Sequence, residues 1–109
     1  MSDDAVDRQL RAYNARDIEA FVACYADDVV VEDQEGTVTL RGRDAVRREY
    51  EPFFERSPEL HAEVLTRIRI GPWVIDEEHI TGRRNGDLHA VAIYRLDADG
   101  RIDRVRFLT

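Results

Sequence analysis

Apolar positions recur at helical spacing in three segments of residues 1–55, so three helices are expected there. The first covers residues 3–14. The second begins after Asp17, whose carboxylate suits a helix N-cap. The third begins at Asp44 and contains Pro52, where we expect a kink or a restart. The apolar residues that define these helices are Val6, Leu10 and Tyr13; then Ile18, Phe21, Val22 and Tyr25; then Ala45, Val46, Tyr50 and Phe53.

The pattern changes to the two-residue alternation of β-strands in the remaining segments. A short hairpin separates the second helix from the third, and four longer strands follow in a meander. The expected strands are residues 29–33, 37–41, 64–70, 73–82, 88–96 and 101–108. The order of elements predicts an α+β fold, in which three N-terminal helices cover a curved antiparallel sheet in a single domain of residues 1–109.

The dipeptide Asn85-Gly86 predicts a two-residue hairpin loop, which pairs His79 with Ala92 and Glu77 with Tyr94. One face of these strands then carries the large aromatic residues, and we expect it to lie under the helices. That face is Trp73, Ile75, Glu77, His79, Thr81, Ala90, Ala92, Tyr94 and Leu96. The opposite face is Val74, Asp76, Glu78, Ile80, His89, Val91, Ile93 and Arg95, a mixture that suits a dimer contact. A β-bulge before Glu77 would exchange the two faces.

Composition excludes several classes of function. The formal net charge is -7, so nucleic acid is not an expected partner. All 16 basic residues are arginine, which excludes mechanisms that need a lysine. The single cysteine, Cys24, cannot form an internal disulfide. The sequence shows neither a signal peptide nor an apolar run of membrane-spanning length, so a cytoplasmic location without membrane contact is expected.

Three segments resemble ketosteroid isomerases and their SnoaL-like relatives, a branch of the nuclear transport factor 2-like superfamily. They run from Tyr13 to Asp33, from Gly42 to Arg47 and from Tyr94 to Ile102. The resemblance covers nearly the whole chain and implies a cone-shaped sheet, a cystatin-like α+β roll. It also implies a closed-ended cavity for a small apolar molecule, and commonly a homodimer through the convex sheet face.

Ketosteroid isomerases use an aspartate base, and a tyrosine with a protonated aspartate to hold the oxyanion. The resemblance puts the base at Asp33, the tyrosine position at Gln9 and the second aspartate position at Ala92. An alanine donates no side-chain hydrogen bond, and loss of one such donor lowers the rate by about 10²–10³. Ordinary ketosteroid isomerase activity is therefore not expected.

Asp33 is the first catalytic candidate, as a general base at the rim of the cavity. The alternative is that its carboxylate only caps the turn at residues 34–36. The second candidate is His79, with Glu77 beside it on the predicted concave face, as a proton-transfer pair. The alternative for His79 is a hydrogen bond to a neighbouring tyrosine, and whether His79 or His89 faces the cavity stays open.

The remaining expected ligand contacts come from the first helix and the last three strands. They are Gln9, Tyr13, Glu77, Ala92, Tyr94, Val105 and Phe107. The three histidines lack the spacing of a metal site, so no metal and no cofactor are expected. Two hypotheses remain: a cofactor-free isomerase, cyclase, dehydratase or hydrolase acting on an apolar, oxygen-bearing molecule, or a non-catalytic binding or dimeric assembly module.

Overall fold

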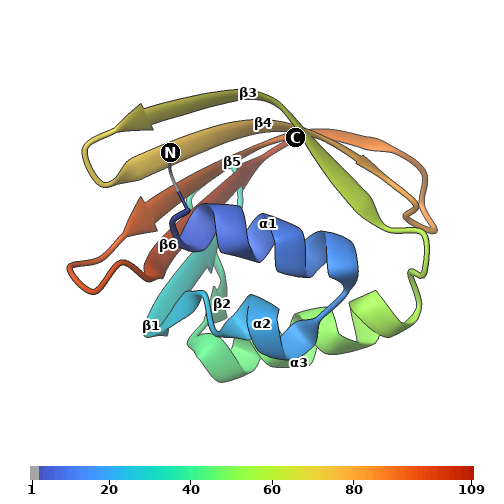
Figure 1. Cartoon of the computed structure of the whole chain (residues 1–109), viewed down its shortest axis with the longest axis horizontal. Helices are drawn as coiled ribbons and strands as arrows, with labels where there is room; N and C mark the ends of the chain where they lie inside the picture. Colours follow the sequence, from blue (N-terminus) through green and yellow to red (C-terminus); the bar gives the residue numbers. More distant parts are fainter. Residues whose placement is uncertain (1–2) are drawn as a thin grey trace.

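A computed structural model describes residues 3–109, which form three helices and one six-stranded sheet. The elements in chain order are α1 (Ala5–Ala15), α2 (Ile18–Val22), β1 (Tyr25–Glu32), β2 (Val38–Arg41), α3 (Arg43–Glu55), β3 (His61–Ile70), β4 (Trp73–Thr81), β5 (Leu88–Leu96) and β6 (Ile102–Leu108). The α+β prediction, with helices covering a curved sheet, is confirmed (Figure 1).

The helices agree with expectation at the start of α2 and depart from it at three other points. Asp17 caps α2 as predicted, accepting a hydrogen bond from the Ala20 amide at 3.1 Å. However, α2 ends at Val22, and Tyr25 already belongs to β1. The N-cap of α3 is Gly42 rather than Asp44, and the helix continues through Pro52.

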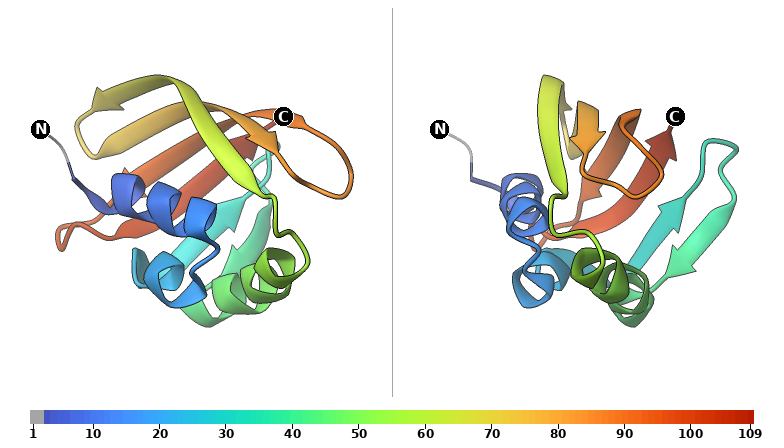
Figure 2. Two further views of the ribbon diagram at one scale, coloured as in Figure 1. Left: turned by 45° about the vertical axis from the view of Figure 1, so that its right-hand side comes forward. Right: turned by 90° about the vertical axis from the view of Figure 1, so that its right-hand side faces the viewer.

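The strands are ordered β2-β1-β6-β5-β4-β3, so the first strand of the chain lies beside the last. The β1–β6 pairing is parallel and every other pairing is antiparallel, which makes the sheet mixed at one junction. The sheet curls around α1, which lies against its concave face, while α2 and α3 close the lower end (Figures 1 and 2).

The predicted register between β4 and β5 is wrong by three residues. Glu77 pairs with Val91 rather than Tyr94, and the last pair before the loop is Ile80 with Leu88. Because three is an odd number, the shift exchanges the two faces of β4 while those of β5 stay as predicted. The buried concave face of β4 is therefore Val74, Asp76, Glu78 and Ile80.

The loop between β4 and β5 explains this shift. The Gly86 amide donates to the Arg83 carbonyl at 3.2 Å, so Asn85-Gly86 closes a turn that starts at Arg83 and is not itself a two-residue loop. Gly82 has a φ of +79°, and a Cβ there would lie 2.0 Å from the Glu59 carbonyl oxygen. Gly82, directly after the last residue of β4, therefore packs closely against the chain after α3, and this long-range contact has no local sequence signal.

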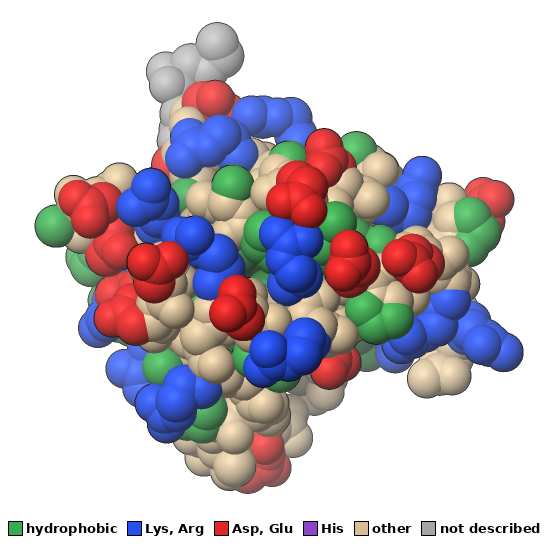
Figure 3. Space-filling view, turned by 90° about the horizontal axis from the view of Figure 1, so that it is seen from below, with side chains coloured by type: hydrophobic (Ala, Val, Ile, Leu, Met, Phe, Trp, Pro, Cys, Tyr) green, Lys and Arg blue, Asp and Glu red, His purple; other side chains and the backbone are tan. Residues whose placement is uncertain are grey.

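The core lies between the helices and the concave face of the sheet. Phe21, Val29, Leu60, Ile102 and Val105 are each at most 1% exposed. Viewed from the side of α2 and α3, acidic and basic side chains are interspersed over the surface (Figure 3). Within residues 3–109, no helix has the length and apolar character needed to cross a membrane.

Candidate functional site

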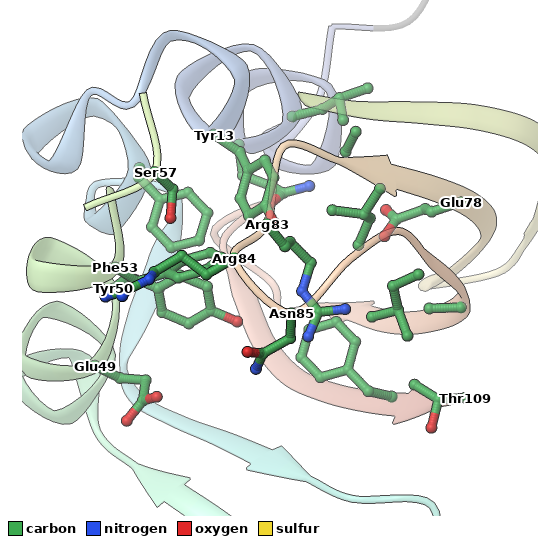
Figure 4. Close-up of a pocket in the computed structure, with 18 of the residues that line it drawn as sticks. Tyr13, Glu49, Tyr50, Phe53, Ser57, Glu78, Arg83, Arg84, Asn85 and Thr109 are labelled. Atoms are coloured by element: carbon green, nitrogen blue, oxygen red, sulfur yellow. The ribbon is translucent and has the colours of Figure 1, made fainter. Parts of the chain in front are cut away.

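A cavity of about 740 Å³ lies between the helices and the concave face of the sheet (Figure 4). Its volume is in the range typical of small-molecule sites. The helical wall comes from α1, α2 and α3, and the opposite wall from β4, β5 and β6. Exposed residues line one end, namely Glu49, Arg56, Arg84, Asn85 and Thr109, and this end is the mouth.

Seven aromatic side chains line the cavity. The lining includes Tyr13, Phe21, Tyr25, Tyr50, Phe53, Tyr94 and Phe107. These rings also pack on one another. The Phe21 and Tyr50 ring centroids are 4.9 Å apart, and those of Phe21 and Tyr25 are 5.1 Å apart. Rings fixed in this way offer a preformed apolar surface to a ligand that itself contains rings.

Glu78 places a carboxyl group in this apolar surrounding. The residue is 4% exposed, lines the cavity from β4, and takes part in no ion pair within residues 3–109 (Figure 4). Burial, together with the nearby charge of Asp76, raises its pKa to about 7, although Arg67 and the Tyr94 hydroxyl partly oppose the shift. Glu78 can therefore exchange a proton near neutral pH.

A short chain of hydrogen bonds positions the groups beside Glu78. The Gln9 Nε2 donates to the Tyr94 hydroxyl at 3.3 Å, and the Tyr25 hydroxyl donates to the Gln9 Oε1 at 3.5 Å. Because the Tyr94 hydroxyl oxygen accepts from Gln9, its own hydrogen remains available for donation. A hydrogen bond from Tyr94 to the Glu78 carboxylate lowers the pKa of Glu78, which agrees with Tyr94 as the donor. Gln9 thus orients Tyr94 toward the carboxyl group.

The four tyrosines of the cavity keep their hydroxyl protons and are therefore able to donate hydrogen bonds. Burial raises the pKa of Tyr13, Tyr25, Tyr50 and Tyr94, and the charge of Glu78 contributes to each increase. Their hydroxyls therefore stay protonated at neutral pH. Such donors suit an oxygen atom of a bound molecule, including one that gains negative charge during a reaction.

Asp76 is the second buried carboxylate on this face of β4, but it lies outside the cavity. It is 0% exposed and accepts two hydrogen bonds from Arg67, from Nε at 2.6 Å and from the guanidinium Nη2 at 2.8 Å. Arg67 also contacts Asp7 of α1. We call Asp7, Arg67 and Asp76 the ion-paired cluster, and its role is to fasten the start of α1 to the sheet.

The structure does not place Asp33 in the cavity. Its Oδ1 accepts the Glu35 and Thr37 amides, each at 3.0 Å, in the turn after β1. This is the turn-capping alternative. The expectation that Asp33 lies at the cavity rim is therefore wrong, because two local backbone donors hold the carboxylate in the turn.

The expected placement of His79 and Glu77 is also wrong, because the register shift turns both to the convex face. The His79 Nε2 lies 3.6 Å from an Asp87 oxygen, with a side chain 44% exposed. Glu77 instead meets His89, at 2.7 Å between Oε2 and Nε2. Neither histidine lines the cavity.

The other predicted ligand contacts divide into two groups. Gln9, Tyr13, Tyr94 and Phe107 line the cavity. Ala92 and Val105 are buried in the core at 0% and 1% exposure and do not line it. Whether the lining residues contact a ligand stays a prediction.

Sequence reasoning missed Glu78, Tyr25, Tyr50 and Ser57 as cavity residues. For Glu78 a signal was present: Val74 and Ile80 flank the two acids on the same strand face, which is unusual for a solvent-facing surface. Within residues 3–109, no three histidine, cysteine or acidic side chains gather as metal ligands. The polar groups of the cavity include the Glu78 carboxyl group, the tyrosine hydroxyls, the Gln9 amide and the lining arginines.

Comparison with known proteins identifies the class. Residues 6–105 match the SnoaL-like domain family, and the chain belongs to that family. A comparison with curated proteins finds no match. The predicted relationship to the SnoaL-like and nuclear transport factor 2-like proteins is therefore confirmed.

Several solved structures share this fold. An uncharacterised cystatin-fold protein from Novosphingobium aromaticivorans is 27% identical, with a TM-score of 0.86 over 96% of this chain and 95% of that one. A proposed polyketide cyclase from Sinorhizobium meliloti is 24% identical, with a TM-score of 0.82 over 98% and 95%. A computationally designed 17-OHP binder is 19% identical, with a TM-score of 0.82 over 96% and 88%.

Proposed function

We propose that this SnoaL-like protein binds a small, ring-bearing, oxygen-containing molecule in its aromatic cavity and that Glu78 exchanges a proton with it. The observation that supports this most directly is a buried carboxyl group without an ion-pair partner in residues 3–109, facing a cavity of about 740 Å³. A buried acid that serves only stability normally has a partner, as Asp76 does.

The reaction class that fits these groups is proton transfer at carbon beside a carbonyl. The Glu78 carboxylate takes the proton from the carbon, and the electron pair of the C–H bond moves onto the carbonyl oxygen to form an enolate. A protonated tyrosine hydroxyl, from Tyr94 or Tyr50, donates a hydrogen bond to that oxygen. The Glu78 carboxylic acid then returns the proton to the same or another carbon, which completes an exchange or an isomerisation.

Deuterium exchange tests this step before the natural substrate is known. In D₂O, the protein is expected to speed deuterium incorporation beside the carbonyl of α-tetralone, measured by NMR. Glu78→Gln is expected to lower the protein-dependent rate at least about 100-fold, as removal of a general base does. The rate should rise with pH through about 7, since the ionised form is the base.

Asp33→Asn is the matched control, because it also removes one carboxylate and keeps an oxygen acceptor for the Glu35 and Thr37 amides. It is expected to leave the exchange rate unchanged. Exchange that survives in Glu78→Gln but disappears in Asp33→Asn would return the base to the position implied by the family resemblance.

The second candidate is a non-catalytic binding protein of the same fold. The position of Asp33 in its turn, away from the cavity, favours it. Ligand-dependent stabilisation of the protein without exchange above the buffer rate would support this candidate. A designed protein with this fold is described as a 17-OHP binder, which supports this candidate.

We also propose a homodimer through the convex face. Ile68 and Ile70 are 53% and 65% exposed on β3, and they pair with Ile75 and Trp73 of β4. A contiguous exposed apolar surface of this kind is typical of a contact between proteins. Light scattering should give twice the mass of one chain for the wild type. For Ile70→Glu it should give the mass of a single chain.

A further inference from the structure

Three arginines line the cavity at its mouth or beside it, and they come from two distant segments. Arg56 follows α3, whereas Arg83 and Arg84 belong to the loop between β4 and β5. The close contact of Gly82 with the Glu59 backbone holds the two segments together. The mouth is therefore basic, with Glu49 as its acidic residue, in a chain of formal net charge -7.

These three arginines differ from many others in the protein. Arg67, Arg95 and Arg104 each form a bidentate pair with a carboxylate. Within residues 3–109, by contrast, Arg56, Arg83 and Arg84 have no acidic side chain within 4.0 Å. Guanidinium groups that line a cavity without a carboxylate partner are available to an anion.

Ser57, the residue after Arg56, provides an independent observation in the same cavity. The residue is 2% exposed and lines the cavity, and its Oγ has no hydrogen-bond partner. Buried hydroxyls are nearly always hydrogen-bonded, because an unpaired one is costly. Figure 4 shows Ser57 and Arg84 on one side of the cavity and Glu78 on the other, so an acceptor bound by Ser57 would lie away from the Glu78 carboxyl group.

We infer that the ligand of this cavity is an amphipathic organic acid, with its rings on the aromatic wall and its anionic oxygens bound by Arg83, Arg84 and Ser57. The inference rests on the proposed function, since it requires that the cavity holds a small molecule. It adds the substrate class: an acid rather than a neutral ketone or alcohol. Placing the anion at the mouth also keeps like charges apart, since Glu78 lies on the far side.

A pair of fluorescent probes tests this class. Pyrenebutyrate and pyrenebutanol share a ring system and a chain, and differ in the charge of the end group. The acid is expected to bind about tenfold more tightly than the alcohol, from charge-assisted hydrogen bonds at the mouth. This preference should shrink as salt is raised from low to high concentration.

The double variant Arg83→Gln, Arg84→Gln should remove the preference. It should weaken binding of pyrenebutyrate and leave binding of pyrenebutanol unchanged. Arg48→Gln is the control, because Arg48 is exposed on α3 and does not line the cavity. Ser57→Ala should weaken binding of pyrenebutyrate several-fold, again without an effect on binding of pyrenebutanol.

The outcomes separate the two proposals. Equal binding of both probes, unchanged in the arginine variants, would overturn the acid inference and leave the cavity proposal standing. If neither probe binds, both the cavity proposal and the acid inference would be overturned. A preference for the acid that persists in the double arginine variant would place the anion elsewhere and also overturn the inference.

Discussion

Asp76 and Glu78 lie two positions apart on the same face of β4, and their exposures are 0% and 4%. Their surroundings differ. Asp76 is held by Arg67 within the ion-paired cluster, whereas Glu78 faces aromatic rings and tyrosine hydroxyls. Equal burial thus gives one carboxylate a structural role and leaves the other able to change its protonation near pH 7. The presence of a cationic partner, rather than burial, separates the two roles.

The largest expected effect comes from removing that partner. Arg67→Met leaves Asp76 buried without a counter-charge, and we expect a loss of about 3–5 kcal/mol in the free energy of unfolding. Chemical denaturation at pH 7 measures it. Arg95→Met is the control, since the Arg95–Asp103 pair is half-exposed and should contribute little. Similar losses in the two variants would remove the distinction between the ion-paired cluster and a surface pair.

Glu78→Gln should instead increase the free energy of unfolding at neutral and higher pH. The pKa of Glu78 is raised from 4.5 to about 7 in the folded protein, so the protonated form favours folding. That stabilisation is fully present below about pH 4.5 and is lost as the pH rises through about 7. We expect the variant to match the wild type near pH 4.5 and to exceed it by about 3 kcal/mol at pH 8.

Unfolding curves of both proteins between pH 4.5 and 8 measure this difference. Asp99→Asn, a change of an exposed acid in the turn before β6, controls for the altered net charge. A wild type that gains stability relative to Glu78→Gln as the pH rises would contradict a raised pKa for Glu78.

A smaller change in stability is expected at Asp33, whose carboxylate lies outside both the ion-paired cluster and the cavity. Asp33→Ala removes the acceptor of two turn amides and should lower the free energy of unfolding by about 1 kcal/mol. Asp33→Asn keeps an acceptor and should be close to neutral. Neither change should alter probe binding in the cavity, and a loss of binding in both would return Asp33 to the site.

The smallest effect is expected for Ser57→Ala in the ligand-free protein. Its Oγ has no partner, so removing it should change the free energy of unfolding by less than about 0.5 kcal/mol, or increase it slightly. Thermal unfolding without ligand measures this. A clear destabilisation would mean that the hydroxyl has a partner within the protein, and Ser57 would no longer support an anion site.

The sequence by itself determined the order and kind of the elements. The strand from Leu88 to Leu96 was predicted with its observed bounds, and its buried face was predicted as well. Asp17 caps its helix as expected. These features depend on side-chain period and on contacts a few residues apart, which the order of residues shows directly.

The tertiary structure alone decided which side chains of β4 face the cavity. The strand could present either Glu77 and His79 or Asp76 and Glu78, and its alternation allows both. Gly82, directly after β4, packs against Glu59, more than 20 residues away along the chain, and a local sequence pattern does not reveal this contact. Asp33 shows the same limit, because its family position suggested a base while two turn amides direct its carboxylate elsewhere.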